Sequence, residues 1–123
     1  MKIHLAKAEG QNQFTAYGDG YVDVNRERIE RSVIVLPDRL IQNWPVASFD
    51  NLADEHFAQL ADLAVEIVLL GSGATMRFPH PRLTAVLLSQ HIGLEVMDNN
   101  AACRTYNILM QEGRKVAAAL IIS

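Results

Sequence analysis

Cysteine is nearly absent from this sequence, and long apolar runs are missing altogether. The single Cys103 excludes an internal disulfide and a metal site built from several cysteines. The longest apolar stretches, such as residues 65–70 and 116–122, are far shorter than the roughly 18 residues that a membrane-spanning helix needs. A membrane span is therefore not expected, and an ordinary hydrophobic core has to hold the fold together.

Positive charge is also scarce. The chain has 11 Lys and Arg residues against 14 Asp and Glu residues, which gives a formal net charge of -3 at pH 7. Nonspecific nucleic-acid binding depends on a surplus of Lys and Arg side chains that neutralise phosphates. This sequence lacks that surplus, so we expect no nucleic-acid partner.

What the sequence does contain is a globular composition. Half of its 123 residues are hydrophobic and a fifth are charged, a balance that excludes general disorder. This length predicts a single domain, residues 1–123, with a polar and loosely held start over residues 1–13. Lys7 and Glu9 stand where a signal peptide would continue its apolar region, so we expect a soluble, cytoplasmic protein.

The first half of the chain has the pattern of short antiparallel strands. Residues 14–24 predict a hairpin, because apolar residues flank Gly18–Gly20, which tolerates the positive φ of a tight turn. The apolar run 33–36, closed by a Pro-Asp pair, predicts a buried strand. A further short strand is expected over residues 40–44.

The second half alternates helices and strands. The first of these strands, over residues 65–70, is apolar and rich in β-branched residues, which is typical of a central strand covered on both faces. A strand, a helix and a following strand imply parallel pairing through a right-handed connection, and we expect the strands over 65–70 and 94–97 both to be heavily covered. With the antiparallel first half, this order predicts a three-layer α/β fold: a central mixed β-sheet with helices and an N-terminal β-hairpin region. The expected elements are a helix over 52–62, a strand over 65–70, a helix over 81–91, a strand over 94–97, a helix ending near 112 and a strand over 116–122.

Residues suited to helix ends accompany the predicted helices. Asp50 or Asn51 is expected to cap the first helix, because a short polar side chain accepts a hydrogen bond from first-turn amides. One of the polar residues in 98–100 is expected to cap the last helix in the same way. Gly93 suits the end of the middle helix, since glycine readily takes the left-handed conformation found there. The apolar face of that helix is expected to include Leu88.

Four segments of the second half are similar to a known family. They are Ile67–Gly73 (IVLLGSG), Gly93–Asp98 (GLEVMD), Ala101–Leu109 (AACRTYNIL) and Gly113–Leu120 (GRKVAAAL). With these segments, the sequence resembles the small uncharacterised bacterial and archaeal proteins related to mitochondrial complex I assembly factor 3, over about residues 14–122. The resemblance implies a three-layer α/β fold around a mixed sheet. It also implies a role as a protein partner in assembly, and it supplies no established catalytic residues.

Small and polar residues follow two neighbouring strands of the predicted sheet, at the point where each strand ends. Parallel strands end at the same edge of a sheet, and ligands of open α/β sheets bind outside those ends, so these residues predict one crevice. Its backbone N–H groups and its arginines would favour an anionic or carbonyl-bearing ligand. The candidate ligand or partner residues are Gly71, Ser72, Gly73, Arg77, Asp98, Asn99, Asn100 and Arg104.

The same residues also have a purely structural interpretation. The Gly-Ser-Gly run suits a tight turn after a strand. It does not meet the dinucleotide-binding pattern, because Met76 stands where the third glycine would fall. Leu70 excludes the Gly-x-Ser-x-Gly elbow of a nucleophilic serine. Asp98 can simply cap the last helix, with Arg104 paired to it or to Glu95.

Candidate catalytic and metal-binding residues are few. The histidines lack the spacing of a helical zinc site, and we expect neither a metal nor a cofactor. His80, between two prolines, could act as a ligand or an acid, or have an ordinary surface role. Cys103, near the start of the last helix, fits a buried and inert thiol better than a reactive one. The four histidines are His4, His56, His80 and His91.

No paired carboxylates and no nucleophile–base pair are recognisable in this sequence. We therefore expect a non-catalytic protein-interaction or assembly and accessory factor with protein partners, as the resemblance implies. The alternative is a small anionic ligand-binding protein, or a weak enzyme, that uses the crevice. A deep crevice would favour the alternative, whereas a flat exposed patch with Phe78, Trp44 or Phe49 would favour a protein partner. The sequence leaves the partner and the oligomeric state open.

Overall fold

The computed structural model describes residues 10–123. The segment expected to be loosely held, residues 1–13, lies mostly outside the described residues. At its end, the side-chain amide of Asn12 donates hydrogen bonds to the carbonyl oxygens of Leu36 and Arg39, both at 2.9 Å. The hydroxyl of Tyr106 donates a further hydrogen bond to the carbonyl oxygen of Asn12 at 2.9 Å. Asn12 therefore ties the chain that leads into the first strand to the rest of the fold.

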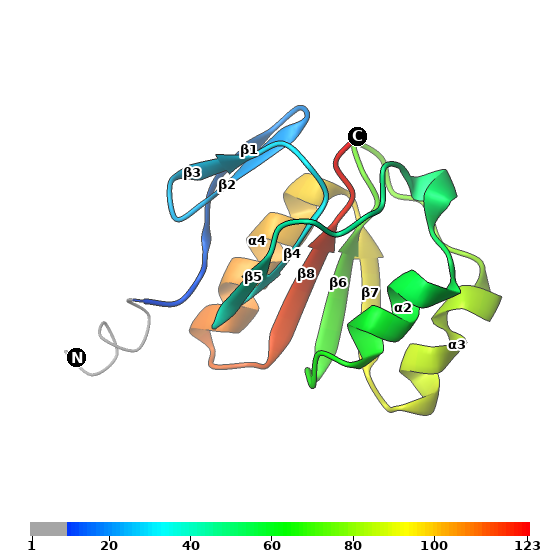
Figure 1. Cartoon of the computed structure of the whole chain (residues 1–123). Coiled ribbons are helices and arrows are strands. Elements are labelled where there is room, and N and C mark those ends of the chain that lie inside the picture. The colour runs from blue at the N-terminus through cyan, green and yellow to red at the C-terminus, as the bar shows by residue number, and fades with distance from the viewer. Residues whose placement is uncertain (1–9) are drawn as a thin grey trace.

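A mixed five-stranded sheet forms the middle layer of the molecule (Figure 1). Its strands are, in spatial order, β5 (Arg39–Ile41), β4 (Val33–Leu36), β8 (Val116–Leu120), β6 (Ile67–Gly71) and β7 (Gly93–Met97). β6 is parallel to both of its neighbours, β7 and β8, whereas β4 is antiparallel to β8 and β5. The predicted parallel pairing of the strands in 65–70 and 94–97 is thus confirmed.

A second, smaller sheet covers part of one face of the first. It contains β1 (Phe14–Gly18), β2 (Tyr21–Val24) and β3 (Glu27–Ile29), all antiparallel. β1 and β2 form the predicted hairpin, but the sequence-based expectation has no counterpart of β3. Only Ile29 of β3 is buried. The preceding turn places Asn25 and Arg26 at positive φ (51° and 71°) without the glycine that usually marks such a turn.

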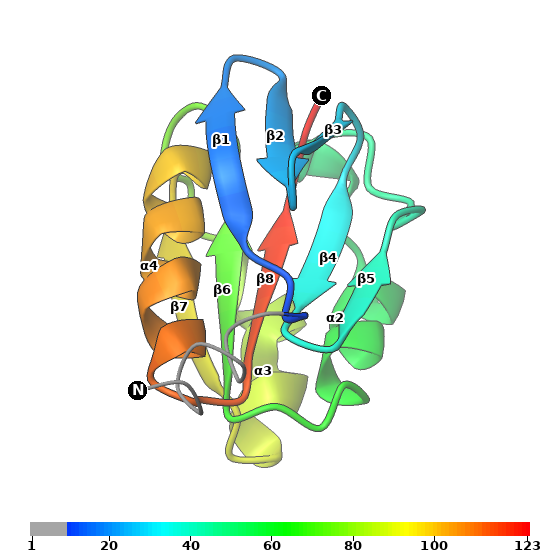
Figure 2. The ribbon, with the colours of Figure 1, turned by 90° about the vertical axis from the view of Figure 1, so that its left-hand side faces the viewer.

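Helices complete the three layers (Figures 1 and 2). α2 (Asp54–Ala61) and α3 (Pro81–Ser89) cover one face of the five-stranded sheet. α4 (Asn99–Gln111) and the small sheet cover the other face. A short 3-10 turn, η1 (Phe49–Asn51), precedes α2. The predicted three-layer α/β arrangement with a mixed sheet is therefore confirmed.

The hydrophobic core has two parts, one on each face of the sheet, and β8 contributes to both. Ala117 and Ala119 belong to the part under α2 and α3, whereas Ala118 belongs to the part under α4. Every residue of β8 is buried, which explains why this strand is apolar throughout. On the α4 side, the rings of Phe14 and Tyr106 pack edge to face with their centroids 5.2 Å apart.

Three expectations about exposure and helix ends need correction. Leu88 is 78% exposed, because Leu83 and Leu87 occupy the buried face of α3. β7 is only half-buried, because it is the outermost strand of the sheet rather than a covered one. Gly93 begins β7 instead of ending α3, and His91 takes the left-handed conformation there, with φ 59°.

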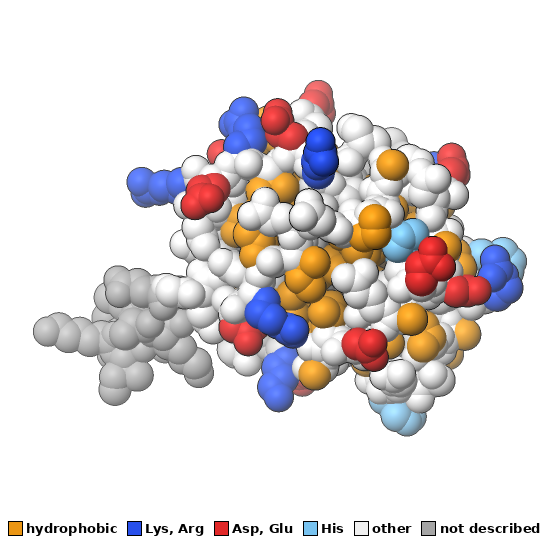
Figure 3. All heavy atoms as spheres, in the orientation of Figure 1, with side chains coloured by type: hydrophobic (Ala, Val, Ile, Leu, Met, Phe, Trp, Pro, Cys, Tyr) orange, Lys and Arg blue, Asp and Glu red, His pale blue; other side chains and the backbone are white. Residues whose placement is uncertain are grey.

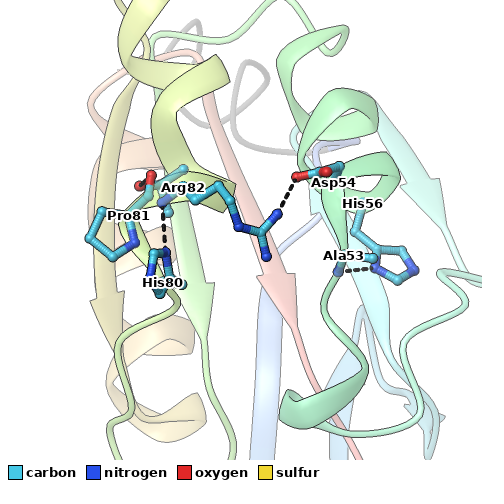
Figure 4. Close-up of polar contacts among 7 residues, drawn as sticks. Ala53, Asp54, His56, His80, Pro81 and Arg82 are labelled. Atoms are coloured by element: carbon cyan, nitrogen blue, oxygen red, sulfur yellow. Dashed lines mark hydrogen bonds and ion pairs between the residues drawn. The ribbon is translucent and has the colours of Figure 1, made fainter.

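The start of α2 also differs from the expectation. Asp50 and Asn51 belong to η1, so neither directly precedes α2. The residue at that position is Ala53, whose backbone N–H donates a hydrogen bond to Nδ1 of His56 at 3.0 Å (Figure 4). Nε2 of His56 lies 3.1 Å from the carbonyl oxygen of Pro45. Since Nδ1 accepts, Nε2 is the protonated nitrogen and donates to this oxygen. His56 therefore holds the start of α2 from within its first turn, by accepting from the N–H of the residue that precedes the helix.

A second histidine caps α3. Nδ1 of His80 accepts a hydrogen bond from the backbone N–H of Arg82 at 3.0 Å (Figure 4). The guanidinium of Arg82 reaches Asp54 at the start of α2, with an N–O distance of 3.4 Å. The starts of α2 and α3 are thereby joined, and His80 has a structural partner that its position between two prolines does not reveal.

Candidate functional site at the carboxyl ends of the strands

The segments that follow β6 and β8 meet the start of α4 at Asn99. Oδ1 of Asn99 accepts a hydrogen bond from the N–H of Gly73 at 3.1 Å, and Nδ2 donates one to the carbonyl oxygen of Ile121 at 2.9 Å. The backbone N–H of Asn99 donates to the carbonyl oxygen of Gly73 at 2.9 Å. Asn99 therefore occupies the place where the sequence predicts the opening of a crevice.

The two glycines of the Gly-Ser-Gly run serve these contacts in different ways. Gly71 is buried, and a Cβ at this position would collide with the side chain of Asn99 and lie 2.6 Å from Cδ2 of Leu120. Gly73 has a φ of 114°, a backbone conformation that L side chains rarely adopt. The glycines are thus needed for close packing and for a turn of the chain.

The hydrogen-bonding groups of Ser72 are used within the chain. Its backbone N–H donates to the carbonyl oxygen of Met97 at 2.9 Å. Its Oγ donates to the carbonyl oxygen of Thr75 at 2.8 Å and accepts from the backbone N–H of Arg77 at 2.9 Å. The N–H groups of Ser72 and Gly73 therefore do not face an open crevice as free donors, which corrects that part of the expectation.

Asp98 caps α4, as predicted. Its Oδ1 accepts a hydrogen bond from the backbone N–H of Ala101 at 2.9 Å, which satisfies a first-turn donor. Its negative charge at the start of the helix also interacts favourably with the helix dipole. Of the other two polar residues in 98–100, Asn99 bonds to the loops after β6 and β8, and Asn100 is exposed.

Arg104 lies against the small sheet. Its guanidinium donates a hydrogen bond to the hydroxyl of Tyr17 at 3.4 Å and lies 5.9 Å from the centre of the Tyr17 ring. This hydrogen bond raises the pKa of Arg104. Within residues 10–123, Arg104 forms no ion pair with Asp98 or Glu95, so that part of the structural interpretation is wrong. The reason is topological: β1 lies beside α4 and presents an aromatic partner.

Arg77 is directed to another partner. It pairs with Asp50 at an N–O distance of 3.0 Å, and its guanidinium lies 4.2 Å from the centre of the Phe49 ring. Phe49 is half-buried under this contact. Trp44 is 3% exposed and Phe78 is 70% exposed. Of the three aromatic residues expected to mark a partner surface, only Phe78 is therefore freely accessible.

A hollow of about 400 Å³ does lie at this end of the sheet, between the β1–β2 turn and the start of α4. It contains the carboxylates of Asp19 and Asp98 and no arginine, so its charge disfavours an anion. The β1–β2 turn is recognisable in the sequence, but its position over the strand ends is not. Four of the predicted site residues line the hollow, Gly73, Asp98, Asn99 and Asn100, and four do not, Gly71, Ser72, Arg77 and Arg104.

A larger hollow of about 670 Å³ includes Trp44, Pro45 and Ile122 in its lining. Figure 3 shows hydrophobic side chains across the middle of the face seen in Figure 1, with charged side chains mostly around the periphery. Nε1 of Trp44 is enclosed and has no hydrogen-bond partner among the described residues. Because this atom is covered, a molecule in the hollow could reach it only after a movement of the indole ring.

Cys103 is buried on α4. Burial raises the pKa of its thiol from the ordinary value of 9.0 to about 12, so the thiol is protonated and inaccessible at neutral pH. This agrees with the expectation of an inert thiol. In the part of the chain that the structure describes, no three His, Cys, Asp or Glu side chains gather as metal ligands would.

These contacts define the class of protein: a small three-layer α/β domain in which α4 and Asn99 close the carboxyl ends of the central strands. None of the helices in residues 10–123 is long and apolar enough to cross a membrane. The chain belongs to the family of proteins of unknown function DUF498/DUF598, whose sequence model matches residues 14–121.

Comparisons with individual proteins agree with this assignment. The chain is 34% identical to NADH dehydrogenase (ubiquinone) 1 alpha subcomplex assembly factor 3 of Bos taurus over 98% of this chain and 68% of that protein. A crystal structure from Bordetella parapertussis matches with a TM-score of 0.87 and 39% identity, over 94% of this chain and 99% of that chain. A Bordetella pertussis protein described as a Mth938-like domain matches with a TM-score of 0.82 and 33% identity, over 94% and 88% of the two chains. The resemblance found in the sequence is thus confirmed.

Proposed function

We propose that this protein acts by binding other proteins, as a non-catalytic assembly or accessory factor, in the cytoplasm. The bovine relative is named as an assembly factor and aligns with 98% of this chain, which supports the proposal. The observation that carries it is a contrast within the structure. Polar groups at the carboxyl ends of the strands bind one another, whereas large hydrophobic side chains are exposed elsewhere.

The four most exposed large hydrophobic side chains lie on the segment between β6 and α3, on α3 and on α4. Met76 (55% exposed) and Phe78 (70%) belong to the segment between β6 and α3, and Leu88 (78%) belongs to α3 itself. Ile108 (57%) belongs to α4. Exposed hydrophobic side chains are typical contacts of protein–protein interfaces, and here they lie on both faces of the central sheet. A partner that covers them would remove this apolar area from water.

Crosslinking in living cells tests the proposal directly. A photoreactive amino acid is placed at Phe78, Leu88 or Ile108, with the exposed polar positions Glu30 and Glu112 as controls. We expect the hydrophobic positions to capture the same protein repeatedly and the polar positions to capture none. Equal capture from all five positions, or from none, would contradict the proposal.

Deletion of the gene tests the parallel with the bovine relative. We expect the source organism to assemble less NADH dehydrogenase when the gene is deleted, as measured on native gels. Complementation with the intact chain restores the complex, and complementation with the Asn99→Ala variant restores it only as far as that variant folds. An unchanged amount of complex would leave protein binding in place but exclude this target.

A small-ligand site in the hollow beside Asp98 is the alternative function. The lining of Gly73, Asn100 and two carboxylates supports a ligand with hydrogen-bond donors rather than an anion. Titration with inorganic phosphate to millimolar concentration, followed by NMR, tests whether the hollow binds an anion. We expect the amides of Ser72, Gly73 and Asn100 to stay unshifted, because the first two donate within the chain.

A further inference from the structure

The two outer strands of the central sheet end it in different ways. β5 has three residues, and the side chain of Asn12 binds the carbonyl oxygen of Arg39 on it. β7 has five residues, contains no proline, and is the last strand of the sheet on its side. A strand in such a position offers a row of backbone groups to another extended chain. β7 is thus the edge at which the described sheet can be extended.

The backbone groups that face outward on β7 can be identified from its contacts with β6. The N–H of Gly93 donates to the carbonyl oxygen of Glu66, and the carbonyl oxygen of Met97 accepts from the N–H of Ser72. Because backbone groups alternate along a strand, Gly93, Glu95 and Met97 point toward β6. The N–H and C=O groups of Leu94 and Val96 therefore point away from the sheet.

Apolar side chains border this edge on the α3 face. Arg82 points from α3 toward Asp54 of α2. At 100° per residue, Leu88 lies about 120° around the helix from Arg82 and about 120° from the midpoint of the buried Leu83 and Leu87, so it faces outward on the side away from α2. Leu88 is 78% exposed, while Leu94 and Val96 of β7 pack against the core beneath α3. A strand added beside β7 would therefore receive cover from Leu88.

The other face of the edge is bordered by α4. Asn107 binds the backbone of Phe14 on β1, which fixes the side of α4 that faces the small sheet. The opposite side of α4 carries the half-buried Leu109, with the exposed Ile108 next to it. In Figure 2, β7 lies behind α4 on that opposite side. The same face of β7 also carries Glu95, which is exposed and forms no ion pair within residues 10–123.

We propose that the open edge of β7 binds an extended segment of a partner protein as a sixth strand, with a Lys or Arg of that segment beside Glu95. The proposal rests on the proposed function and names the surface that carries it. Backbone hydrogen bonds to Leu94 and Val96 hold the segment. Its alternate side chains are apolar on the face of Leu88 and basic on the face of Glu95, since neighbouring side chains on one face of a sheet interact directly.

A second copy of this chain fits the edge less well than a basic segment. Antiparallel pairing of two β7 strands over their full length, residues 93–97, places Glu95 directly opposite Glu95 of the other copy. Two like charges at such a position destabilise a strand pair. The exposed glutamate therefore acts against self-association and in favour of a partner with positive charge.

A synthetic peptide of alternating Val and Lys residues tests the chemistry of this edge. NMR hydrogen exchange of the full chain is measured with this peptide and with a matched peptide of alternating Val and Glu. We expect the Lys peptide to slow exchange of the Leu94 and Val96 amides by about tenfold or more, and the Glu peptide to have no effect. Glu95→Lys should reverse this preference, whereas Glu30→Lys, the same change at an exposed glutamate outside β7, should leave it intact. Protection of amides elsewhere, or an unchanged preference in Glu95→Lys, would overturn the proposal.

Crosslinking in cells separates this inference from the broader proposal. A photoreactive residue at Glu95 is expected to capture a partner, and Leu88→Asp should reduce that capture while Glu30→Lys, at an exposed position outside β7, should not. Capture from Phe78 but not from Glu95 would overturn the edge as the docking site and leave protein binding in place. Capture of a second copy of this chain at Glu95 would also overturn it. Capture from neither position would count against the proposed function itself.

Discussion

At the carboxyl ends of β6 and β8, the backbone groups of the loops are hydrogen-bonded within the chain, to the side chain of Asn99 and through the N–H of Ser72. Along β7, the backbone groups of Leu94 and Val96 face outward and only the side chains beside them are packed. Both boundaries belong to one sheet, and they lie on neighbouring strands. The difference shows that small residues at strand ends do not by themselves indicate a ligand site, because here they admit a side chain of the same chain.

The largest expected effect on stability comes from removing the side chain of Asn99 at the ends of β6 and β8. Asn99→Ala removes the acceptor of the Gly73 N–H and the donor to the Ile121 carbonyl, and should lower the free energy of unfolding by about 3 kcal/mol. Urea denaturation measures the change. Asn100→Ala, at the exposed neighbouring position, is the matched control and should stay within about 0.5 kcal/mol of the unchanged protein. Equal effects of the two substitutions would refute the role of Asn99.

Adding a Cβ at Gly71, next to Asn99, should have the next largest effect on stability. Gly71→Ala places a Cβ against Asn99 and Leu120 and should destabilise the fold by about 2 kcal/mol. The double variant with Asn99→Ala should lose less than the sum of the two single variants, because the collision with Asn99 is then gone. Strict additivity in denaturation experiments would show that the glycine and the asparagine do not act together.

Alkaline pH tests the burial of the Cys103 thiol on α4, the helix that begins at Asn99. Burial raises the pKa of Cys103 from its ordinary 9.0 to about 12, so the thiol ionises in the unfolded chain before it ionises in the folded one. The contribution of the buried thiol to the free energy of unfolding is fully present below about pH 9 and is lost as the pH rises toward 12. At pH 10 the free energy of unfolding should be lower by about 1.4 kcal/mol for this reason. Burial raises the pKa of Tyr106 as well, which acts in the same direction.

Thermal unfolding between pH 8 and pH 10 measures this loss. Cys103→Ala should show a smaller decrease over the same range than the unchanged chain, even if its stability at pH 8 is lower. A thiol that reacts with a colorimetric reagent in the folded protein at pH 8 would contradict the burial argument.

The smallest effect is expected at the open boundary. Glu95→Lys changes an exposed side chain that forms no ion pair in the described chain, so the free energy of unfolding should change by less than about 0.5 kcal/mol. A loss comparable to that of Asn99→Ala would mean that β7 is as firmly closed as the strand ends, and the contrast between the two boundaries would disappear.

The sequence predicts the parts of this fold that depend on local signals. The parallel pairing of β6 and β7 follows from the strand–helix–strand order, and the cap at Asp98 follows from a short acidic side chain before a helix. β3 is not predictable in the same way, because two of its three residues are charged and its turn has Arg26 where a glycine would mark it. The edge position of β7 is decided by which strand pairs with β8, which periodicity does not reveal.

The candidate site is predictable only in part, because its contacts join distant residues. Arg104 and Tyr17 are 87 positions apart, so nothing near α4 indicates that the arginine faces the small sheet. Asn99 and Gly73 are 26 positions apart, and an asparagine beside an N-cap looks in the sequence like another candidate cap. The location of the strand ends could be inferred, whereas the identity of the groups that close them required the three-dimensional arrangement.

The position of β8 has a consequence for the synthesis of this protein. β8 is the last of the strands to leave the ribosome, yet it lies between β4 and β6 and is buried throughout. Until it emerges, the β4–β5 pair and the β6–β7 pair have no strand in common and cannot form one sheet. A nascent chain therefore holds its earlier strands with unpaired edges, and the five-stranded sheet closes only after β8 has emerged.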